Sequence, residues 1–247
     1  MFKNKTVFIT GCNRGIGKNI SYKFLENGAN IICCVRKKDK KLENTFRKKK
    51  KFKSQSISFI EIDLSDYKNL KNVIKDNNIH KKKIDFLINN AAIAHGSIFE
   101  MTKIEKVKDV FEINFFSQLN LIQLLLLSLK KSDYPSIVNI SSISGLISER
   151  GNIAYGTSKA ALMFASKVLA NELSNYNIRV NCIAPSIVDD GMSSMMTDLS
   201  KNLLQNNSYF KDKIPVEHIS EIVLFLCTKS SQFINGTTIK VDGGTKL

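Results

Sequence analysis

A tyrosine and a lysine four positions apart, Tyr155 and Lys159, could carry out a proton transfer. They open a stretch with a helical pattern. Positions i and i+4 lie on one face of a helix, so the phenol and the ammonium can point into one cleft. A free tyrosine has a pKa of about 10, and a nearby ammonium favours its phenolate. The pair is therefore a candidate general acid/base, although the same spacing also occurs on helices with a purely structural role.

A glycine-rich turn near the N-terminus could bind phosphate. It follows a strand-like run and precedes a helix, and its Gly-x3-Gly-x-Gly spacing is a variant of the dinucleotide fingerprint. Glycine allows a tight turn and lets backbone N–H groups approach a pyrophosphate at the positive end of the helix. Such a turn can be only structural, but its place after the first strand favours a dinucleotide. The residues predicted to contact it are Gly11, Asn13, Arg14, Gly15, Ile16 and Gly17.

The end of the second predicted strand bears on which dinucleotide is bound. An acidic residue there would accept hydrogen bonds from the adenosine ribose, whereas arginine suits a 2′-phosphate. The chain has Val35 followed by Arg36 at this place, and Arg14 adds a second cation on the same side. Two arginines without a carboxylate predict NADP(H) rather than NAD(H).

The elements that must position these residues alternate between short apolar runs and longer helical patterns. The predicted strands are Thr6–Thr10, Asn30–Val35, Ser56–Ile62, Asp85–Asn90, Ser136–Ser141, Arg179–Ala184 and Thr238–Val241. The predicted helices are Ile16–Asn27, Asp39–Lys50, Tyr67–Asn77, Ile104–Lys130, Ala154–Tyr176 and Val216–Lys229. Continuous apolar strands between helices indicate a parallel sheet covered on both faces. We therefore expect an α/β fold: one doubly wound Rossmann domain over residues 1–247, with a seven-stranded parallel sheet.

The composition is that of a soluble globular protein, with 43% hydrophobic and 24% charged residues. Five cysteines without Cys-x-x-Cys or Cys/His ligand spacing argue against a disulfide framework or a metal site and suit a reducing cytoplasm. No export signal follows Met1. The longest apolar stretch, Phe115–Leu129, contains several polar residues and is shorter than the about 20 residues of a bilayer span. We expect it to be a buried or interface helix.

Much of the formal net charge of +15 lies in the segment 36–53. A solvated helix face in a lysine-rich chain explains such a run, and attraction of an anionic cofactor or carrier protein is the alternative. Nucleic acid is disfavoured because the run has few interleaved aromatic residues beyond Phe46 and Phe52.

Further motifs occur in a fixed order around Tyr155. Ser142 lies 13 positions before it, Asn114 lies 41 positions before it, and Asp63 follows the third predicted strand. The chain also has Asn-Asn-Ala-Ala at 89–92, Asn-Gly-Thr at 235–237 and Val-Asp-Gly-Gly at 241–244. Over nearly the whole chain this ordered set resembles the short-chain dehydrogenase/reductase family. The length and the ending are nearest in appearance to the 3-oxoacyl-ACP reductases of that family.

The resemblance implies a role for each of these residues. Tyr155 passes a proton to a carbonyl oxygen while a nicotinamide delivers hydride to the carbon, and Ser142 hydrogen-bonds that oxygen. Lys159 lowers the Tyr155 pKa and holds the nicotinamide ribose, and Asn114 anchors a water that leads from Lys159 to solvent. Ser141 competes for the role of Ser142, but the spacing favours Ser142. The other implied cofactor contacts are Asp63, Leu64, Asn89, Ala91, Pro185 and Val188.

Three positions depart from the family pattern. Ala92 and Ser186 stand where glycine is usual, and Asp190 stands where a threonine commonly contacts the cofactor. A carboxylate near a diphosphate is repulsive unless it turns away, so Asp190 is not included among the predicted contacts.

The resemblance leaves three functions open. The first is an NADPH-dependent reductase of a 3-oxoacyl thioester on an acyl carrier protein, with Lys130, Lys131 and Lys167 as candidate docking cations. Against it, Asp133 and Tyr176 stand where docking arginines of that subgroup are expected. The second acts on a sugar, a polyol or a cyclic ketone or alcohol, for example in surface-polysaccharide precursor synthesis. The third, a non-catalytic dinucleotide sensor, is disfavoured because the catalytic tyrosine and lysine are both present.

Two further expectations concern a lid and an assembly. Residues 191–213 are predicted to form a substrate lid, with Met192, Met195 and Met196 as an adaptable apolar wall or as its internal packing. The helices at 103–130 and 154–176 carry more apolar surface than one core face requires. Family members commonly pair them across a two-fold axis, so we expect a homodimer or homotetramer.

Overall fold

Seven parallel strands form one sheet in the computed structural model, which describes residues 1–189, 205 and 207–245. The strands are β1 (Thr6–Thr10), β2 (Asn30–Val35), β3 (Ile57–Glu61), β4 (Phe86–Asn89), β5 (Ser136–Ile140), β6 (Arg179–Pro185) and β7 (Thr238–Val241). Their order across the sheet is β3-β2-β1-β4-β5-β6-β7. The bounds agree with the predicted strands to within one residue, which confirms the predicted sheet.

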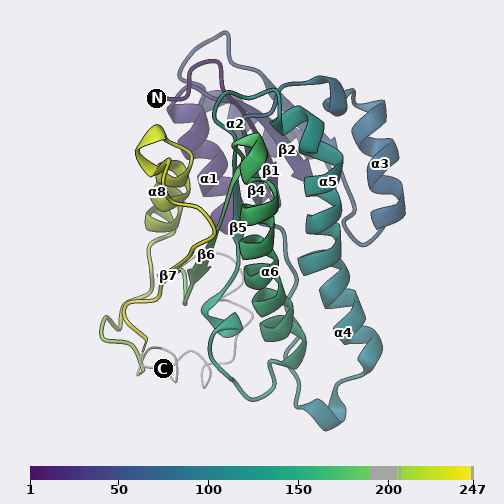
Figure 1. Cartoon of the computed structure of the whole chain (residues 1–247), viewed down its shortest axis with the longest axis vertical. Coiled ribbons are helices and arrows are strands. Elements are labelled where there is room, and N and C mark those ends of the chain that lie inside the picture. The colour runs from purple at the N-terminus through teal and green to yellow at the C-terminus, as the bar shows by residue number, and fades with distance from the viewer. Residues whose placement is uncertain (190–204, 206, 246–247) are drawn as a thin grey trace.

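Helices cover both faces of this sheet (Figure 1). The helices are α1 (Gly15–Glu26), α2 (Lys40–Lys48), α3 (Tyr67–Asp76), α4 (Ile104–Phe111), α5 (Ser117–Leu129), α6 (Ile153–Glu172) and α8 (Val216–Leu226). α1, α2 and α8 pack on one face, and α3, α5 and α6 pack on the other. The doubly wound α/β fold is therefore confirmed.

Alternate residues of each strand supply the cores on the two faces, because successive side chains of a strand point to opposite sides. Val7 and Ile9 join Phe24 of α1 and Val223 of α8 in one buried cluster. Phe8, between them, joins the cluster on the other face with residues of α3, α5 and α6. Fully burying one such side chain contributes about 1.5–3 kcal/mol, so the sheet is a firm base for the loops at its edge.

One long helix on the second face contains a π-helical turn. Residues Glu112–Phe116 have π-helical hydrogen bonding and join α4 to α5, giving a continuous helix from Ile104 to Leu129. By length and composition alone this helix could cross a membrane. Leu121 and Leu125 are completely buried in the core beneath the sheet, so it serves here as a core helix. The apolar stretch considered in the sequence is only its second half, because the first half is rich in charged residues.

The strand order reverses between β1 and β4. The chain passes from β1 outward to β2 and β3, then returns to place β4 on the other side of β1. In open α/β sheets, ligands bind at the carboxyl ends of the strands beside such a reversal. The glycine turn follows β1, Asn90 follows β4 and Ser142 follows β5, so all three lie along this edge.

Candidate active site

The glycine-rich turn leads from β1 directly into α1. Gly11 and Gly15 have φ of +71° and +56°, left-handed conformations that glycine adopts without strain. A Cβ at Gly17 would overlap the Asn90 side chain and the Gly11 carbonyl, so only glycine fits there. The first backbone N–H groups of an α-helix have no partner within it, and the first turn of α1 contains no acidic residue. This donor set fits a diphosphate.

Exposed cations flank the glycine turn. Arg14 and Asn13 are exposed at the start of α1, and Arg36 is exposed directly after β2. Asp63, after β3, accepts hydrogen bonds from Oγ and the backbone N of Ser65 at 2.7 and 2.9 Å. These bonds lower the pKa of Asp63, and the charge of Arg36 acts in the same direction. Arg36 and Asp63 therefore lie near each other at the edge of the sheet.

Asn90 holds the glycine turn in place, a role that the sequence analysis missed. Its Nδ2 donates to the carbonyl oxygens of Thr10 and Gly11 at 3.0 and 3.2 Å. In return, the backbone N–H groups of Asn90 and Ala91 donate to Thr10 Oγ1 at 2.9 and 3.0 Å. The ends of β1 and β4 are thus tied together where the strand order reverses. The sequence did contain a signal for this role, because Asn90 lies in the Asn-Asn-Ala-Ala motif between two predicted contacts, Asn89 and Ala91.

Asn89 differs from its expected place. Its side chain is 1% exposed and donates through Nδ2 to Asn139 Oδ1 of β5 at 2.8 Å. Among the described residues, its Oδ1 has no hydrogen-bond partner. The side chain lies inside the fold, so only the backbone of Asn89 remains available for the predicted cofactor contact.

The remaining predicted cofactor residues are apolar. Ile16 of the glycine turn packs on a cluster containing Val188 and Val216, which joins the start of α1 to the segment after β6. Pro185 is the last residue of β6, and Leu64 is buried in the core of the second face. The start of α1 and the segment after β6 are therefore packed together through Ile16.

Tyr155 and Lys159 lie in the first two turns of α6, which docks on the end of β5. Lys159 is 2% exposed, and its Nζ donates to the carbonyl oxygen of Ile140 at 2.7 Å. The Ser141 hydroxyl donates to the carbonyl oxygen of Lys159 at 2.9 Å. The Ser141 hydroxyl is therefore used in a hydrogen bond to α6. Ser142 is only partly buried and interacts with the Tyr155 phenol, as the spacing predicts.

Burial controls the protonation of this pair. It raises the pKa of Tyr155 to about 12, against the interaction with Ser142, which lowers it. Burial likewise lowers the pKa of Lys159 to about 8. The sequence analysis expected Lys159 to lower the pKa of Tyr155. In the structure burial is the largest influence on the Tyr155 pKa, and the Lys159 ammonium is bonded to the Ile140 carbonyl, with Nζ 5.7 Å from the centre of the phenol ring.

Asn114 lies in the π-helical turn and is completely buried. Its Oδ1 accepts from the backbone N of Ile93 at 2.9 Å, and its Nδ2 donates to the Ile93 carbonyl at 2.9 Å and to Ser158 Oγ at 3.1 Å. Ser158 in turn donates to the Tyr155 carbonyl at 2.7 Å. Asn114 thus links the loop after β4 to α6, and one lone pair of Oδ1 is left for the predicted water.

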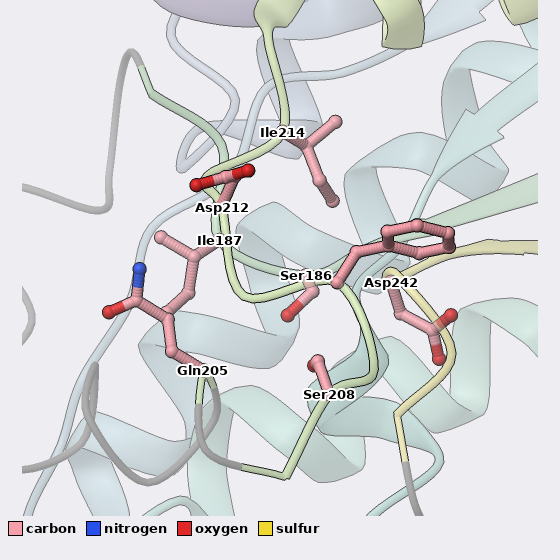
Figure 2. A pocket seen from close by; sticks show the side chains of 8 residues that line it. Ser186, Ile187, Gln205, Ser208, Asp212, Ile214 and Asp242 are labelled. Carbon is pink, nitrogen blue, oxygen red and sulfur yellow. The ribbon is translucent and has the colours of Figure 1, made fainter.

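A small recess lies at the ends of β6 and β7 (Figure 2). Its described lining residues are Ser186, Ile187, Gln205, Ser208, Phe210, Asp212, Ile214 and Asp242. Figure 2 shows Asp212 and Asp242 on opposite sides of Ser186. The described lining contains two carboxylates and no cation, so this part of the edge suits phosphate less well than the glycine turn does. Asp190 and most of the predicted lid, with its three methionines, lie outside the described residues.

The chain has relatives among known proteins over nearly its full length. A family model described as enoyl-(acyl carrier protein) reductase matches residues 11–246. A 3-oxoacyl-[acyl-carrier-protein] reductase of Chlamydia trachomatis is 32% identical over 244 residues, which are 98% of this chain and 97% of that protein.

Solved structures with different ligands have the same fold. A 3-oxoacyl-[acyl-carrier protein] reductase from Brucella melitensis in complex with NAD matches with a TM-score of 0.89 and 23% identity over 100% of both chains. L-Sorbose reductase from Gluconobacter frateurii, complexed with NADPH and L-sorbose, matches with a TM-score of 0.88 and 23% identity, covering 99% of this chain and 97% of that one. At such identities the likeness concerns the fold alone.

We expect Asn90→Ala to loosen the glycine turn. The change removes two hydrogen bonds and leaves buried carbonyl oxygens without a donor, which should lower the free energy of unfolding by about 1–3 kcal/mol. Affinity for NADPH should fall as well. Urea unfolding and fluorescence titration with NADPH measure the two effects. The exposed Asn44 of α2, changed to alanine, is the matched control. Unchanged stability and affinity in Asn90→Ala would show that Asn90 does not hold the turn.

Proposed function

We propose that this chain, which belongs to the short-chain dehydrogenase/reductase family and is an oxidoreductase acting on CH–OH and C=O groups, reduces a carbonyl group with NADPH. One observation carries the proposal. A phenol, a serine hydroxyl and a buried ammonium lie together beside the end of β5, on the same edge of the sheet as the glycine turn. A dinucleotide sensor without catalytic activity has no need of this group.

Each polar side chain has a part in the proposed reaction. Bound NADPH supplies the hydride. Tyr155 donates its proton to the carbonyl oxygen, and with a pKa of about 12 the phenol stays protonated at neutral pH, as a proton donor must. Ser142 donates a hydrogen bond to the same oxygen and stabilises its developing charge. Lys159, with a pKa of about 8, remains mostly charged at neutral pH and would hold the nicotinamide ribose. Asn114 fixes the loop that faces them.

The preference for NADPH rests on charge at the adenosine end. Arg36 follows β2 where an acidic residue would favour NAD, and Arg14 is exposed at the start of α1. Guanidinium groups form strong charge-assisted hydrogen bonds with phosphate. The basic segment 36–53 adds a long-range attraction for the same anion.

A 3-oxoacyl thioester is the substrate class to test first. The similarity to the 3-oxoacyl reductase of Chlamydia supports it, and so does the exposed cation Lys167 near the expected docking surface for an acidic carrier. At the two positions where docking arginines were expected, the residues make other contacts. Asp133 forms an ion pair with Lys83 at 3.1 Å. Tyr176 is contacted by Lys130, whose Nζ lies 3.3 Å from the centre of the ring. A sugar, a polyol or a cyclic ketone is therefore the second candidate.

The proposal also covers domain organisation and location. We infer a single domain over residues 1–247, a substrate lid at 191–213 and a cytoplasmic enzyme.

The apolar side chains exposed on the long helix and on α6 suit a second copy of the chain. They include Phe116 and Leu127 on the former and Phe164 and Val168 on the latter, with Leu127 71% and Phe164 70% exposed. Large apolar side chains that are exposed in this way are typical of interfaces between subunits.

NADPH oxidation in the presence of acetoacetyl-CoA and acetoacetyl-ACP tests the function, alongside a keto-sugar and a cyclic ketone. We expect turnover with at least one thioester. Tyr155→Phe should retain fold and NADPH affinity but lose about two to four orders of magnitude in kcat, because the proton donor is gone. Thioesters that are inert while a keto-sugar or cyclic ketone turns over would establish the second substrate class. A Tyr155→Phe enzyme with more than a tenth of the original kcat would overturn the catalytic assignment.

Arg36→Ala should weaken NADPH binding selectively. Losing a charge-assisted contact costs about 1.5–3 kcal/mol, which corresponds to roughly tenfold or more in affinity, whereas NADH lacks the 2′-phosphate and should bind nearly as before. Arg47→Ala, on the exposed face of α2, is a control for the loss of a nearby positive charge. Tighter binding of NADH than of NADPH by the unmodified protein would refute the preference.

Light scattering should give a mass of two or four chains of 27.8 kDa at micromolar concentration. Leu127→Asp combined with Phe164→Asp should shift the protein to monomers, because a charge in an apolar interface is costly to desolvate. Tyr67→Asp, an exposed aromatic position on α3, should leave the assembly intact. A monomer in the unmodified protein would contradict this expectation.

A further inference from the structure

We propose that Glu149 is a positioning residue: its carboxylate joins the Ser142 turn to the start of α6, and its negative charge in this linker favours carbonyl reduction over alcohol oxidation. This inference rests on the proposed function of Tyr155. Glu149 lies between the two catalytic positions in the chain, and none of the motifs identified in the sequence includes it.

The carboxylate bridges two elements through one oxygen. Glu149 Oε2 accepts a hydrogen bond from Ser144 Oγ at 3.0 Å and another from Asn152 Nδ2 at 2.8 Å. Ser144 belongs to the short 3₁₀ turn Ile143–Gly145, and its backbone N–H donates to Ser142 Oγ at 3.2 Å. Asn152 is the residue that precedes α6, and its carbonyl accepts from Gly156 of the first helical turn at 2.8 Å. The bridge therefore connects the serine side of the site to the tyrosine side.

The turn and the helix meet in close contact, which makes their relative position sensitive to this bridge. A Cβ at Gly156 would come within 2.6 Å of the Ser144 carbonyl oxygen, and a Cβ at Gly145 within 2.7 Å of the Ala160 backbone N. The two glycines allow the backbones of the turn and the helix to approach this closely. The Glu149 carboxylate supplies a fixed connection beside this contact.

The charge of Glu149 also acts on the phenol. It raises the pKa of Tyr155, in the same direction as burial, because a nearby negative charge disfavours the phenolate. The opposing contribution comes from Ser142 on the turn. On α6 itself, the Lys159 ammonium is bonded to the Ile140 carbonyl, and Cys182 of β6 acts on Lys159. Among the described carboxylates, only that of Glu149 contributes to the raised pKa of Tyr155.

The direction of the reaction determines which form of Tyr155 is useful. In reduction, hydride adds to the carbonyl carbon, the phenol O–H bond breaks, and the proton moves to the carbonyl oxygen. The phenolate then regains a proton from solvent. In oxidation, the phenolate takes the alcohol proton while hydride leaves for the oxidised cofactor. The phenol is protonated at neutral pH in any case, so a carboxylate that disfavours the phenolate leaves the proton donor for reduction in place and moves the onset of oxidation to higher pH.

Glu149→Gln separates the two effects. The glutamine carbonyl oxygen has two lone pairs and can accept both hydrogen bonds, so the bridge is kept while the charge is removed. We expect reduction near neutral pH to stay within about twofold of the original kcat, and the rise of alcohol oxidation with increasing pH to begin at lower pH. Glu149→Ala removes bridge and charge together and should lower kcat for reduction by roughly tenfold to a hundredfold, because the serine and the tyrosine lose their alignment. Glu172→Gln, an exposed position at the end of α6, is the matched control for charge.

An ultraviolet titration provides a readout that needs no substrate. The chain has six tyrosines and no tryptophan, so the difference between Glu149→Gln and the double variant with Tyr155→Phe isolates the Tyr155 phenolate. Its appearance at lower pH than in the unmodified protein, measured against Tyr155→Phe alone, would support the inference. An unshifted pH profile and an unshifted titration in a folded Glu149→Gln protein would overturn it, as would full activity of Glu149→Ala. If no carbonyl compound turns over, the proposed function fails, and the titration still decides the role of Glu149.

Discussion

A buried ammonium group needs a partner, and this requirement organises the catalytic side of the molecule. Removing the charge of Lys159 from water costs several kcal/mol unless it is compensated, and the Ile140 carbonyl at 2.7 Å supplies part of the compensation. The bond can form only while α6 stays docked on the end of β5. A second hydrogen bond joins the same two elements, because the Ser141 hydroxyl, directly after β5, donates to the carbonyl oxygen of Lys159 in α6. Tyr155, one helical turn earlier, is therefore placed by the docking of its neighbour.

The phosphate side follows a different principle, because its ligand groups belong to the backbone. Left-handed Gly11 and Gly15 and the unpaired N–H groups of α1 form the surface, and Asn90 fixes it by bonding to Thr10 and Gly11. Asn90 can do so because β1 and β4 are neighbours, although they are far apart in the sequence. The reversal of strand order thus supplies both the edge at which ligands of such sheets bind and the side chain that holds the turn there.

The sequence predicted the structure well where the local pattern of residues already reflects their environment in the fold. Parallel strands covered on both faces give continuous apolar runs, so β2 (Asn30–Val35) was predicted to the residue. Asn89 and Asn90 are the same residue type, and only the pairing of β4 with β5 decides which one lies inside the sheet. The pKa of Tyr155 could not be inferred from its spacing to Lys159, because the spacing does not reveal the burial that raises it. The π-helical turn around Asn114 also has no sequence signature that the helical pattern could reveal.

The segment between Ser142 and Tyr155 joins the end of β5 to the start of α6. Its ends must meet at the junction of β5 and α6, whatever the reaction, so their spacing is set by the fold. Between them lies the short 3₁₀ turn Ile143–Gly145, and loops of this kind can carry functional side chains without altering the sheet. In this chain the interior holds a carboxylate bonded to Ser144 and Asn152, a few residues from the phenol. Charges interact more strongly in a partly buried site than in water, so one residue there can alter the chemistry of Tyr155 while the sheet is unchanged.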